Sequence, residues 1–177
     1  MDKRKIANQK VKTSITSALF ELLKEKSISE ISITEIINKA HVARASFYRN
    51  YSSKESVITT LIQDILVDYH EEIKFEDGNF YTYENIYKSF KCFKKYGSQV
   101  LDLHRFGYGS ILLDMLNQFH EYIAGDMHFK SIKRYELYIY IGALYNTALI
   151  WLQSGAKESP EELAELFTSA TKKREEY

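Results

Sequence analysis

Residues 32–55 constrain the fold of this chain more than any other stretch, because they divide into short helical segments separated by a tight turn. Ser32 is followed three positions later by Glu35, which is the capping-box pattern that opens a helix. Residues 44–50 then predict a second short helix with Phe47 as its inward-facing anchor. Two short helices joined by a turn of a few residues are an arrangement that presents one helix to the major groove of DNA.

Helical periodicity continues through most of the remaining chain. We expect further helices over residues 5–26, 52–69, 83–96, 98–105, 110–123, 130–154 and 160–173. Additional capping boxes are predicted at residues 52–55 and 159–162. One Pro and seven Gly in 177 residues leave little room for a turn-rich β fold. The predicted fold class is therefore all-α with about nine helices, and residues 74–82 are the best candidate for a linker.

The formal net charge of zero conceals a difference between the two ends of the chain. Residues 1–60 contain eleven Lys/Arg and six Asp/Glu, a net charge of +5, whereas the remainder contains thirteen and eighteen, a net charge of −5. A basic end on an acidic body suits a protein that meets phosphate groups at one end. Because such an excess is also common on solvated helices, the charge pattern supports nucleic-acid binding without establishing it.

Side chains of the basic end suit contacts with double-stranded DNA. Ser32 and Thr34 lie at a predicted helix N-terminus, where hydroxyl and free N–H groups suit a phosphate oxygen. Arg44 and Ala45 open the next helix, where an arginine can bind guanine and an alanine can contact a thymine methyl group. The predicted DNA-contacting residues are Ser32, Thr34, Ala43, Arg44, Ala45, Ser46, Tyr48, Arg49, Asn50 and Lys54.

These residues divide into two expected roles. Phosphate contacts are expected from Thr34, Tyr48 and Lys54. Sequence specificity is expected mainly from Arg44, Ser46, Arg49 and Asn50. The alternative is that two short surface helices simply connect larger ones. The absence of any acidic residue between Glu35 and Glu55 favours the DNA-binding interpretation.

Catalytic and metal-binding functions have little support in the sequence. There is no Gly-rich phosphate loop, no nucleophile motif and no pair of carboxylates forced together by spacing, so we expect neither an enzyme nor a cofactor. His104 and His120 could share a metal with Asp102 or Glu121, but no metal-ligand spacing supports this, and no metal site is predicted. The single cysteine, Cys92, excludes an internal disulfide and is expected to be a small core residue.

One segment approaches the length and composition of a membrane span. Residues 137–156 carry no charge, but polar residues interrupt them, and tyrosines lie within the segment rather than only at its ends. A helix buried on both sides explains the pattern better, so no membrane partner is predicted. The polar residues after Asp2 do not resemble a signal peptide, and a cytoplasmic location is expected.

Residues 33–55 resemble the helix-turn-helix signature of TetR-type (TetR/AcrR) transcriptional regulators. The positions in register are Thr34, Phe47, Tyr48, Tyr51, Lys54 and Glu55. Residues 142–155 and 158–163 also resemble the last two helices of many members. The resemblance implies a helix-turn-helix DNA-binding domain at 1–54 and a helical ligand-binding and dimerisation domain at 55–177. It also implies a regulator, expected to be a repressor, that binds a palindromic operator as a homodimer under the control of a small hydrophobic effector.

Two positions depart from the family pattern. His41 stands where the family usually has Gly, at a turn position where a positive φ is expected. Ala43 stands where Ser or Thr is usual, so the second helix of the motif lacks a side-chain cap, at an expected cost of about 1 kcal/mol. These differences put the usual DNA contact at position 43 in question and leave the fold unaffected.

The resemblance places the dimer interface on the last two helices. Residues 137–152 are apolar around nearly the whole helix circumference, which suits one face on the chain's own core and another on a partner. The residues predicted for this interface are Tyr138, Ile141, Tyr145, Leu149, Leu152, Leu163, Leu166 and Phe167. The sequence leaves open which stripe faces the partner, and a monomeric core remains an alternative.

An effector pocket is likewise implied by the resemblance, in an aromatic-rich central region. The predicted ligand-binding residues are Tyr87, Phe90, Phe106, Phe119 and Tyr140. The alternative is that aromatics at helical spacing simply fill the core. For the chain as a whole, the alternative to a DNA-binding regulator is an all-α ligand-binding or protein-interaction module that does not bind DNA.

Overall fold

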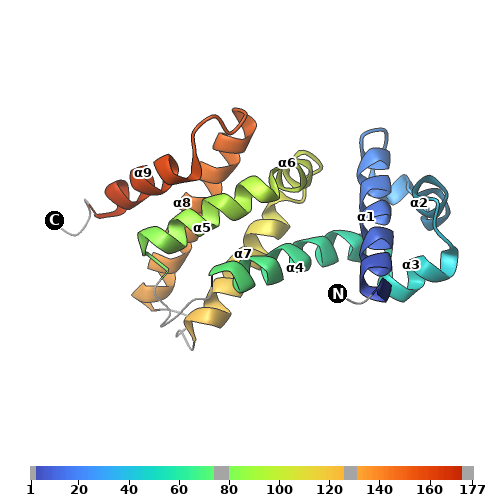
Figure 1. The fold of residues 1–177 in the computed structure, drawn as a ribbon, viewed down its shortest axis with the longest axis horizontal. Coiled ribbons are helices and arrows are strands. Elements are labelled where there is room, and N and C mark those ends of the chain that lie inside the picture. The colour runs from blue at the N-terminus through green and yellow to red at the C-terminus, as the bar shows by residue number, and fades with distance from the viewer. Residues whose placement is uncertain (1–2, 74–79, 126–130, 173–177) are drawn as a thin grey trace. The chain divides into compact units, whose positions relative to one another are not determined.

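The computed structural model describes residues 3–73, 80–125 and 131–172, and within these ranges it contains α-helices, one 3₁₀ turn and no strand (Figure 1). The elements are α1 (Lys3–Leu23), η1 (Ile28–Glu30), α2 (Ile33–Ala40), α3 (Arg44–Asn50), α4 (Lys54–Ile73), α5 (Tyr83–Lys95), α6 (Gly97–Arg105), α7 (Gly109–Ala124), α8 (Ile132–Gln153) and α9 (Pro160–Lys172). The prediction of an all-α fold is confirmed.

The chain divides into two compact units, Met1–Asp64 and Ile65–Tyr177, and α4 belongs to both. The predicted domain boundary after residue 54 coincides with the start of this helix, whereas the division by contacts falls inside it. The functional assignment of the two domains stays a prediction. Most of the linker candidate at 74–82 lies outside the described residues.

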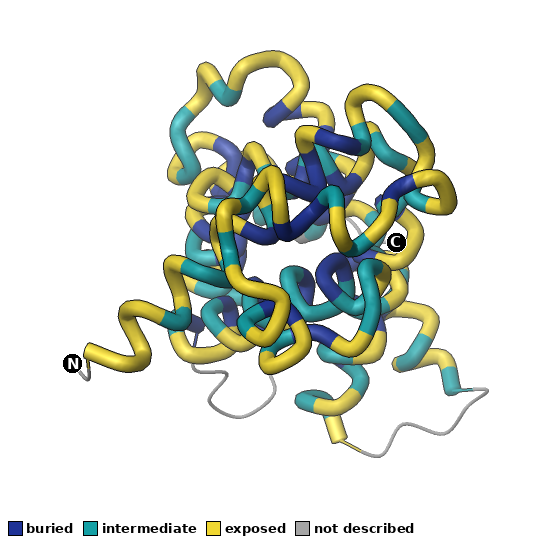
Figure 2. Tube along the Cα trace, turned by 90° about the vertical axis from the view of Figure 1, so that its right-hand side faces the viewer, coloured by how far each residue is buried: buried dark blue, intermediate teal, exposed yellow. Residues whose placement is uncertain are grey.

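The N-terminal unit is built around the buried stripe of α1. Ile15 and Leu19 are fully buried, as are Ile36 of α2 and Phe47 of α3. The ring of Phe47 also contacts that of Tyr51, with centroids 5.6 Å apart. Figure 2 shows that such buried positions recur along the helices with exposed positions between them. Burial of these apolar side chains therefore fixes α3 from its inner side and leaves its outer side exposed.

Helix ends in this unit differ from the predictions at two places. Helix α1 ends at Leu23 rather than residue 26, and an unpredicted 3₁₀ turn at Ile28–Glu30 follows it, with Ser27 as its N-cap. Helix α4 begins at Lys54 instead of residue 52. Its cap is a reciprocal pair between Ser53 and Ser56, each backbone N–H donating to the other's hydroxyl over 3.1 Å, so the predicted box at 52–55 was displaced by one residue.

The C-terminal unit is a helical bundle in which α5 packs along α9, and α7 packs along α8. Phe90 of α5 is fully buried and makes edge-to-face contacts with Trp151 of α8 and Phe167 of α9. The capping box predicted at 159–162 is confirmed, because Ser159 and Glu162 exchange hydrogen bonds of 2.7 and 3.2 Å at the start of α9.

A buried polar cluster joins α4, α5 and α7 inside this unit. The hydroxyl of Tyr69 lies 2.9 Å from Ser89 Oγ and 3.2 Å from His120 Nε2. His120 Nδ1 lies 2.8 Å from the carbonyl oxygen of Leu116, which can only accept, so Nδ1 carries the imidazole proton and Nε2 accepts from Tyr69. Burial lowers the pKa of His120 from 6.5 to about 4, because the charged imidazolium is poorly solvated there.

Candidate nucleic-acid interface

The turn between α2 and α3 has the backbone conformation that the sequence predicted. His41 has φ 52° and ψ 44°, which is the left-handed region, and it ends α2. Its backbone N–H donates to the carbonyl of Asn38, and the next N–H, of Val42, donates to that of Ile37 over 3.1 Å. Positive φ at a single residue turns the chain sharply enough to start a new helix three residues later.

Ala43 occupies the N-cap of α3, and no side-chain hydrogen bond caps the helix there. The prediction that this cap lacks its usual hydroxyl is confirmed. Helix α3 therefore begins on backbone contacts alone, with the N–H groups of Ser46 and Phe47 donating to the Ala43 carbonyl over 2.9 and 3.3 Å.

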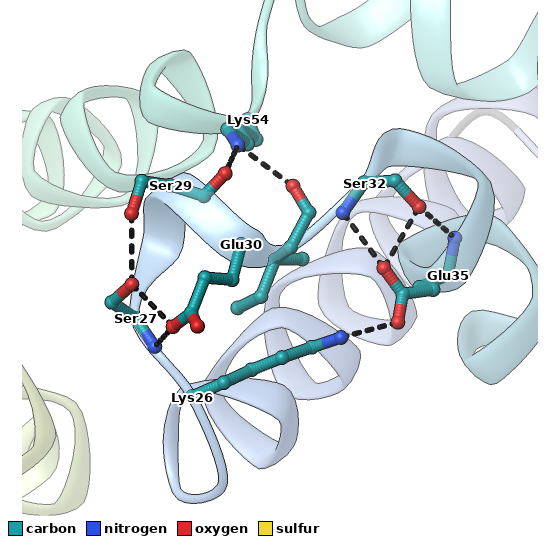
Figure 3. Close-up of polar contacts among 8 residues, drawn as sticks. Lys26, Ser27, Ser29, Glu30, Ser32, Glu35 and Lys54 are labelled. Atoms are coloured by element: carbon teal, nitrogen blue, oxygen red, sulfur yellow. Dashed lines mark hydrogen bonds and ion pairs between the residues drawn. The ribbon is translucent and has the colours of Figure 1, made fainter.

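The N-terminus of α2 carries the predicted capping box (Figure 3). The Glu35 N–H donates to Ser32 Oγ over 3.2 Å, and the Ser32 N–H donates to the Glu35 carboxylate over 2.9 Å. Lys26 forms an ion pair with the same carboxylate. These contacts, led by the hydrogen bond from Lys26, lower the pKa of Glu35 from 4.5 to about 2. The carboxylate therefore stays ionised, and the positive charge of Lys26 beside it limits its repulsion of a phosphate near Ser32 and Thr34.

Three predicted contact residues meet where α2 and α3 adjoin. The Arg44 guanidinium lies 3.4 Å from Thr34 Oγ1 and 3.5 Å from the Tyr48 hydroxyl. It also lies 5.6 Å from the centre of the Tyr48 ring, within the range of a cation–π contact. All three residues are exposed. The cluster offers a cation and two hydroxyl groups on one surface, which is a suitable set of donors for a phosphate oxygen.

A second pair lies further round α3. Arg49 donates to Ser46 Oγ over 3.0 Å, leaving most of its guanidinium donors available. Arg49 and Ala45 are exposed, and Ser46 is half-buried. The predicted residues of α2, α3 and their adjoining turns are all exposed or half-buried, with Arg44 beside α2 and Arg49 further round α3: Ser32, Thr34, Ala43, Arg44, Ala45, Ser46, Tyr48 and Arg49.

Two predicted residues are engaged inside the unit instead. Asn50 exchanges side-chain hydrogen bonds with Asn8 of α1 and also donates to the Ser46 carbonyl over 2.9 Å. The ammonium group of Lys54 donates to the carbonyl oxygens of Ser29 over 3.2 Å and Ile31 over 2.7 Å (Figure 3). In this arrangement both side chains hold the fold together. Sequence reasoning missed Asn8, whose place in α1 carries no signal of a partner 42 positions later.

Comparison with known proteins agrees with this geometry. Residues 15–60 match the family described as bacterial regulatory proteins, tetR family. The chain also shares its fold with a TetR transcriptional regulator from Streptococcus agalactiae 2603V, at a TM-score of 0.59 and 21% identity over 94% of this chain and 96% of that one. Residues 15–60 are thus a TetR-type segment, and the described chain has the fold of TetR-type regulators.

Other solved structures share the TetR-type fold. A tetR-family transcriptional regulator from Streptomyces coelicolor superposes with a TM-score of 0.56 at 19% identity, over 90% of this chain and 78% of that one. The dihydroxyacetone kinase operon activator DhaS superposes with a TM-score of 0.53 at 15% identity, over 90% and 93%. Identities this low establish the fold and carry no residue-level function.

One curated relative of this chain is YvdT of Bacillus subtilis (strain 168), described as an uncharacterized HTH-type transcriptional regulator. The two are 32% identical over 71 residues, which is 38% of this chain and 37% of YvdT. YxbF of the same strain carries the same description and is 37% identical over 57 residues, covering 32% of this chain and 15% of YxbF. The matched part thus spans about a third of the first relative and less of the second. The matched N-terminal segment and the fold are those found in transcriptional regulators with a helix-turn-helix DNA-binding domain.

The residues predicted for an effector site are dispersed in the structure. Phe90 and Tyr140 belong to the core, Phe119 packs on the buried cluster around Tyr69, and Tyr87 and Phe106 are half-buried elsewhere. None of the five lines the apolar cavity found in the C-terminal unit. That cavity, of about 20 Å³, is lined by Ile65, Leu66, Tyr69, Cys92, Phe93, Tyr96, Val100, Leu112 and Leu116. The effector-site residues therefore stay a prediction, since helical spacing does not distinguish core aromatics from those beside a void.

The residues predicted for a dimer interface belong mostly to the chain's own core. Those buried within the subunit are Ile141, Tyr145, Leu149, Leu152, Leu163 and Phe167. Tyr138 is half-buried beside Arg134, whereas Leu166 of α9 is 60% exposed. A side chain already buried against its own subunit is not available to a partner. The dimer interface therefore stays a prediction, and the residues named for it on α8 lie mostly on its inner stripe.

The outer stripe of α8 is apolar and exposed. Ile132, Tyr135, Ile139 and Ile150 are 71%, 54%, 56% and 65% exposed. Their successive spacings of three, four and eleven residues place them on one helix face. Isolated exposed apolar residues are ordinary, but a stripe along one long helix marks an interaction surface.

The histidines, the cysteine and the long apolar segment are the other features that the sequence singled out. His120 is buried against Tyr69, whereas His104 is exposed, and within the described residues no three metal-ligating side chains gather at one place. Cys92 is buried, which raises the pKa of its thiol to about 12. Among the helices that the structure describes, none has the length and hydropathy needed to cross a membrane.

Proposed function

We propose that this chain is a transcriptional repressor that binds a palindromic operator as a homodimer, acts in the cytoplasm, and loses DNA affinity when a small hydrophobic effector binds its C-terminal domain. The observation that supports DNA binding is the exposed outer face of α3 (Arg44–Asn50), anchored from within by the fully buried Phe47. Such a helix can enter the major groove while its neighbours hold the phosphate backbone.

The outer stripe of α8 supports the homodimer. A two-fold symmetric dimer pairs the same surface of both subunits, and Ile139 and Ile150 would then be buried against their counterparts. Two identical α3 helices related by that axis read the two halves of a palindrome. Exposed Leu166 of α9 is proposed to join the same interface.

The apolar cavity of the C-terminal unit supports an effector of small, neutral and apolar chemistry. The hydroxyl groups at its wall are already engaged, that of Tyr69 with Ser89 and that of Tyr96 with Asp68. At about 20 Å³ the cavity holds little more than one water molecule, so effector binding requires its walls to move. Three of its lining residues, including Leu66, lie on α4, the helix shared by both units. An effector that prefers the expanded cavity can thereby bias the DNA-binding unit.

The direction of regulation depends on where the operator lies relative to the promoter. A bound dimer blocks transcription when its site overlaps a promoter, and this is the outcome that we propose for this chain. DhaS, which has the same fold, is described as an operon activator. A reporter gene placed behind the selected operator tests the sign, because repression lowers its expression when this chain is supplied.

Selection of duplexes from random DNA by the purified full chain tests the central proposal. We expect a palindrome whose half-site centres are separated by about one helical turn or a multiple of it. Thr34→Ala combined with Tyr48→Ala should weaken binding at least tenfold, whereas Tyr122→Ala, which removes a tyrosine that is 85% exposed in the C-terminal unit, should not. Failure to enrich any duplex contradicts the proposal.

A protein-interaction module is the competing function. The dependence of binding on salt concentration distinguishes it from a DNA-binding protein. Binding that neutralises several phosphates releases counterions, so the logarithm of the association constant should fall linearly and steeply with the logarithm of salt concentration. An interaction of the N-terminal unit that is indifferent to salt favours a protein partner.

A further inference from the structure

Helix α3 carries two arginines, and the backbone places them on different faces. A helix advances about 100° per residue, so Arg49 lies about 160° from the buried anchor Phe47, whereas Arg44 lies about 60° from it. Ala45, four residues before Arg49, shares its face. The side of α3 opposite its anchor is the side that faces a docked duplex, and Arg49 and Ala45 occupy its centre.

Arg44 is drawn away from that centre by its neighbours. It is the first residue of α3, and side chains in a helix lean toward its N-terminus, which directs Arg44 toward α2. There its guanidinium meets Thr34 at 3.4 Å and Tyr48 at 3.5 Å. Both partners are hydroxyl groups suited to phosphate. The three side chains together form a backbone-binding cluster rather than a base reader.

Arg49 has a different environment. Within the described part of the chain, its guanidinium donates to Ser46 Oγ over 3.0 Å, one turn back on the same helix. This contact occupies one guanidinium nitrogen and orients the side chain along the helix. Four further N–H donors remain for the fork geometry in which arginine binds the O6 and N7 atoms of guanine. Asn50, which was also expected to read bases, is hydrogen-bonded to Asn8 instead.

We propose that Arg49 reads a guanine in each operator half-site, with Ser46 as its positioning residue, while Arg44 binds the phosphate backbone. This inference rests on the proposed DNA-binding function and deepens it by assigning the specificity of the recognition helix. Ala45 beside Arg49 is placed to contact the methyl group of a neighbouring thymine. The expected half-site therefore contains a G·C pair at the position that faces the middle of α3.

Duplex selection by the full chain and by matched arginine variants tests this assignment. The parent should enrich one G·C pair per half-site, and Arg49→Ala should lose that preference by at least about fivefold. Arg49→Lys keeps the charge but lacks the fork, so it should lose the preference too. Arg44→Ala should keep the preference, bind all duplexes more weakly, and reduce the salt slope by about one. Ser46→Ala should weaken the preference and Ser46→Thr should retain it.

The possible outcomes distinguish the assignment of Arg49 from the DNA-binding function on which it rests. Both arginines are exposed, so the circular dichroism spectra of all variants should match the parent. If Arg49→Ala selects the same half-site as the parent, or if Arg44→Ala alters the selected base, the assignment to Arg49 is overturned while DNA binding stands. If the parent itself selects no duplex, the DNA-binding function fails and the assignment fails with it.

Discussion

Asn8 of α1 and Asn50 of α3 exchange two side-chain hydrogen bonds. Asn8 Nδ2 donates to Asn50 Oδ1 over 2.9 Å, and Asn50 Nδ2 donates to Asn8 Oδ1 over 3.1 Å. The two residues are 42 positions apart, and both are half-buried. The paired amides tie the start of the first helix to the end of the recognition helix. The sequence expectation that Asn50 contacts DNA therefore competes with a structural role.

Replacement of either asparagine by alanine tests that role. We expect Asn8→Ala and Asn50→Ala each to lower the free energy of unfolding by about 1 kcal/mol, because the remaining amide loses its partner. The double variant should cost less than the sum of the two single changes, since both remove the same interaction. Urea unfolding at one protein concentration measures this. Strictly additive losses would show that the amides act independently.

The uncapped N-terminus of α3 offers a stabilising change. Ala43→Ser supplies a hydroxyl at an N-cap whose backbone is already extended, with φ −69° and ψ 145°. We expect the free energy of unfolding to rise by about 1 kcal/mol. Ala45→Ser, which adds the same hydroxyl two residues later in the helix, is the matched control and should not stabilise. Equal effects of the two variants would contradict the capping explanation.

Lys54 is expected to contribute to the free energy of unfolding whether or not it contacts DNA. Lys54→Met keeps the aliphatic stem but leaves the carbonyls of Ser29 and Ile31 without their ammonium donor. We expect a loss of about 1–2 kcal/mol in the free energy of unfolding, typical for hydrogen bonds from a charged group. Lys10→Met, at an exposed position of α1, should leave stability nearly unchanged. A Lys54 variant that is as stable as the parent but fails to bind DNA would restore the phosphate-contact interpretation.

The exposed stripe of α8 predicts how the proposed dimer can be broken. Ile139→Glu combined with Ile150→Glu places two charges on the stripe, and burial of these charges in a symmetric interface is strongly unfavourable. We expect the variant to sediment as a folded monomer. Val67→Glu changes a residue of α4 that is similarly exposed, at 57%, and should leave the dimer intact. A dimer that survives the α8 changes places the interface elsewhere.

Buried His120 predicts a loss of stability on mild acidification. Its pKa is about 4 in the folded chain against 6.5 for the exposed group, so protonation favours the unfolded state. The stabilising contribution is complete above pH 6.5, falls as the pH drops toward about 4, and is constant below that. Between pH 7 and pH 5 the expected loss in the free energy of unfolding is about 2 kcal/mol.

Unfolding of the parent and two histidine variants across this pH range measures that contribution. His120→Gln cannot titrate, so its stability should vary less with pH than that of the parent. His104→Gln removes an exposed histidine and should retain the pH dependence of the parent. If His120→Gln and the parent lose stability in parallel, another group is responsible.

Local chemistry let the sequence determine the helices and the motif. The α3 bounds, Arg44–Asn50, match the expectation, and His41 takes the left-handed conformation foreseen for its turn. These features depend on residues close together in the chain: a cap, a spacing of three or four, or a single backbone angle. The register of Thr34, Phe47 and Tyr48 with the TetR-type signature is of the same kind.

The assignment of faces and partners was decided only by the tertiary structure. Helix α8 is apolar on nearly every side, so periodicity did not tell which stripe is buried. Packing within the C-terminal unit buries the stripe that contains Ile141. In the sequence Asn50 and Lys54 looked like free polar groups, because their partners, Asn8 and the Ser29 carbonyl, come close to them only in the folded chain. Whether a side chain serves a ligand or the fold depends on contacts distant in sequence, and only the folded chain brings those contacts together.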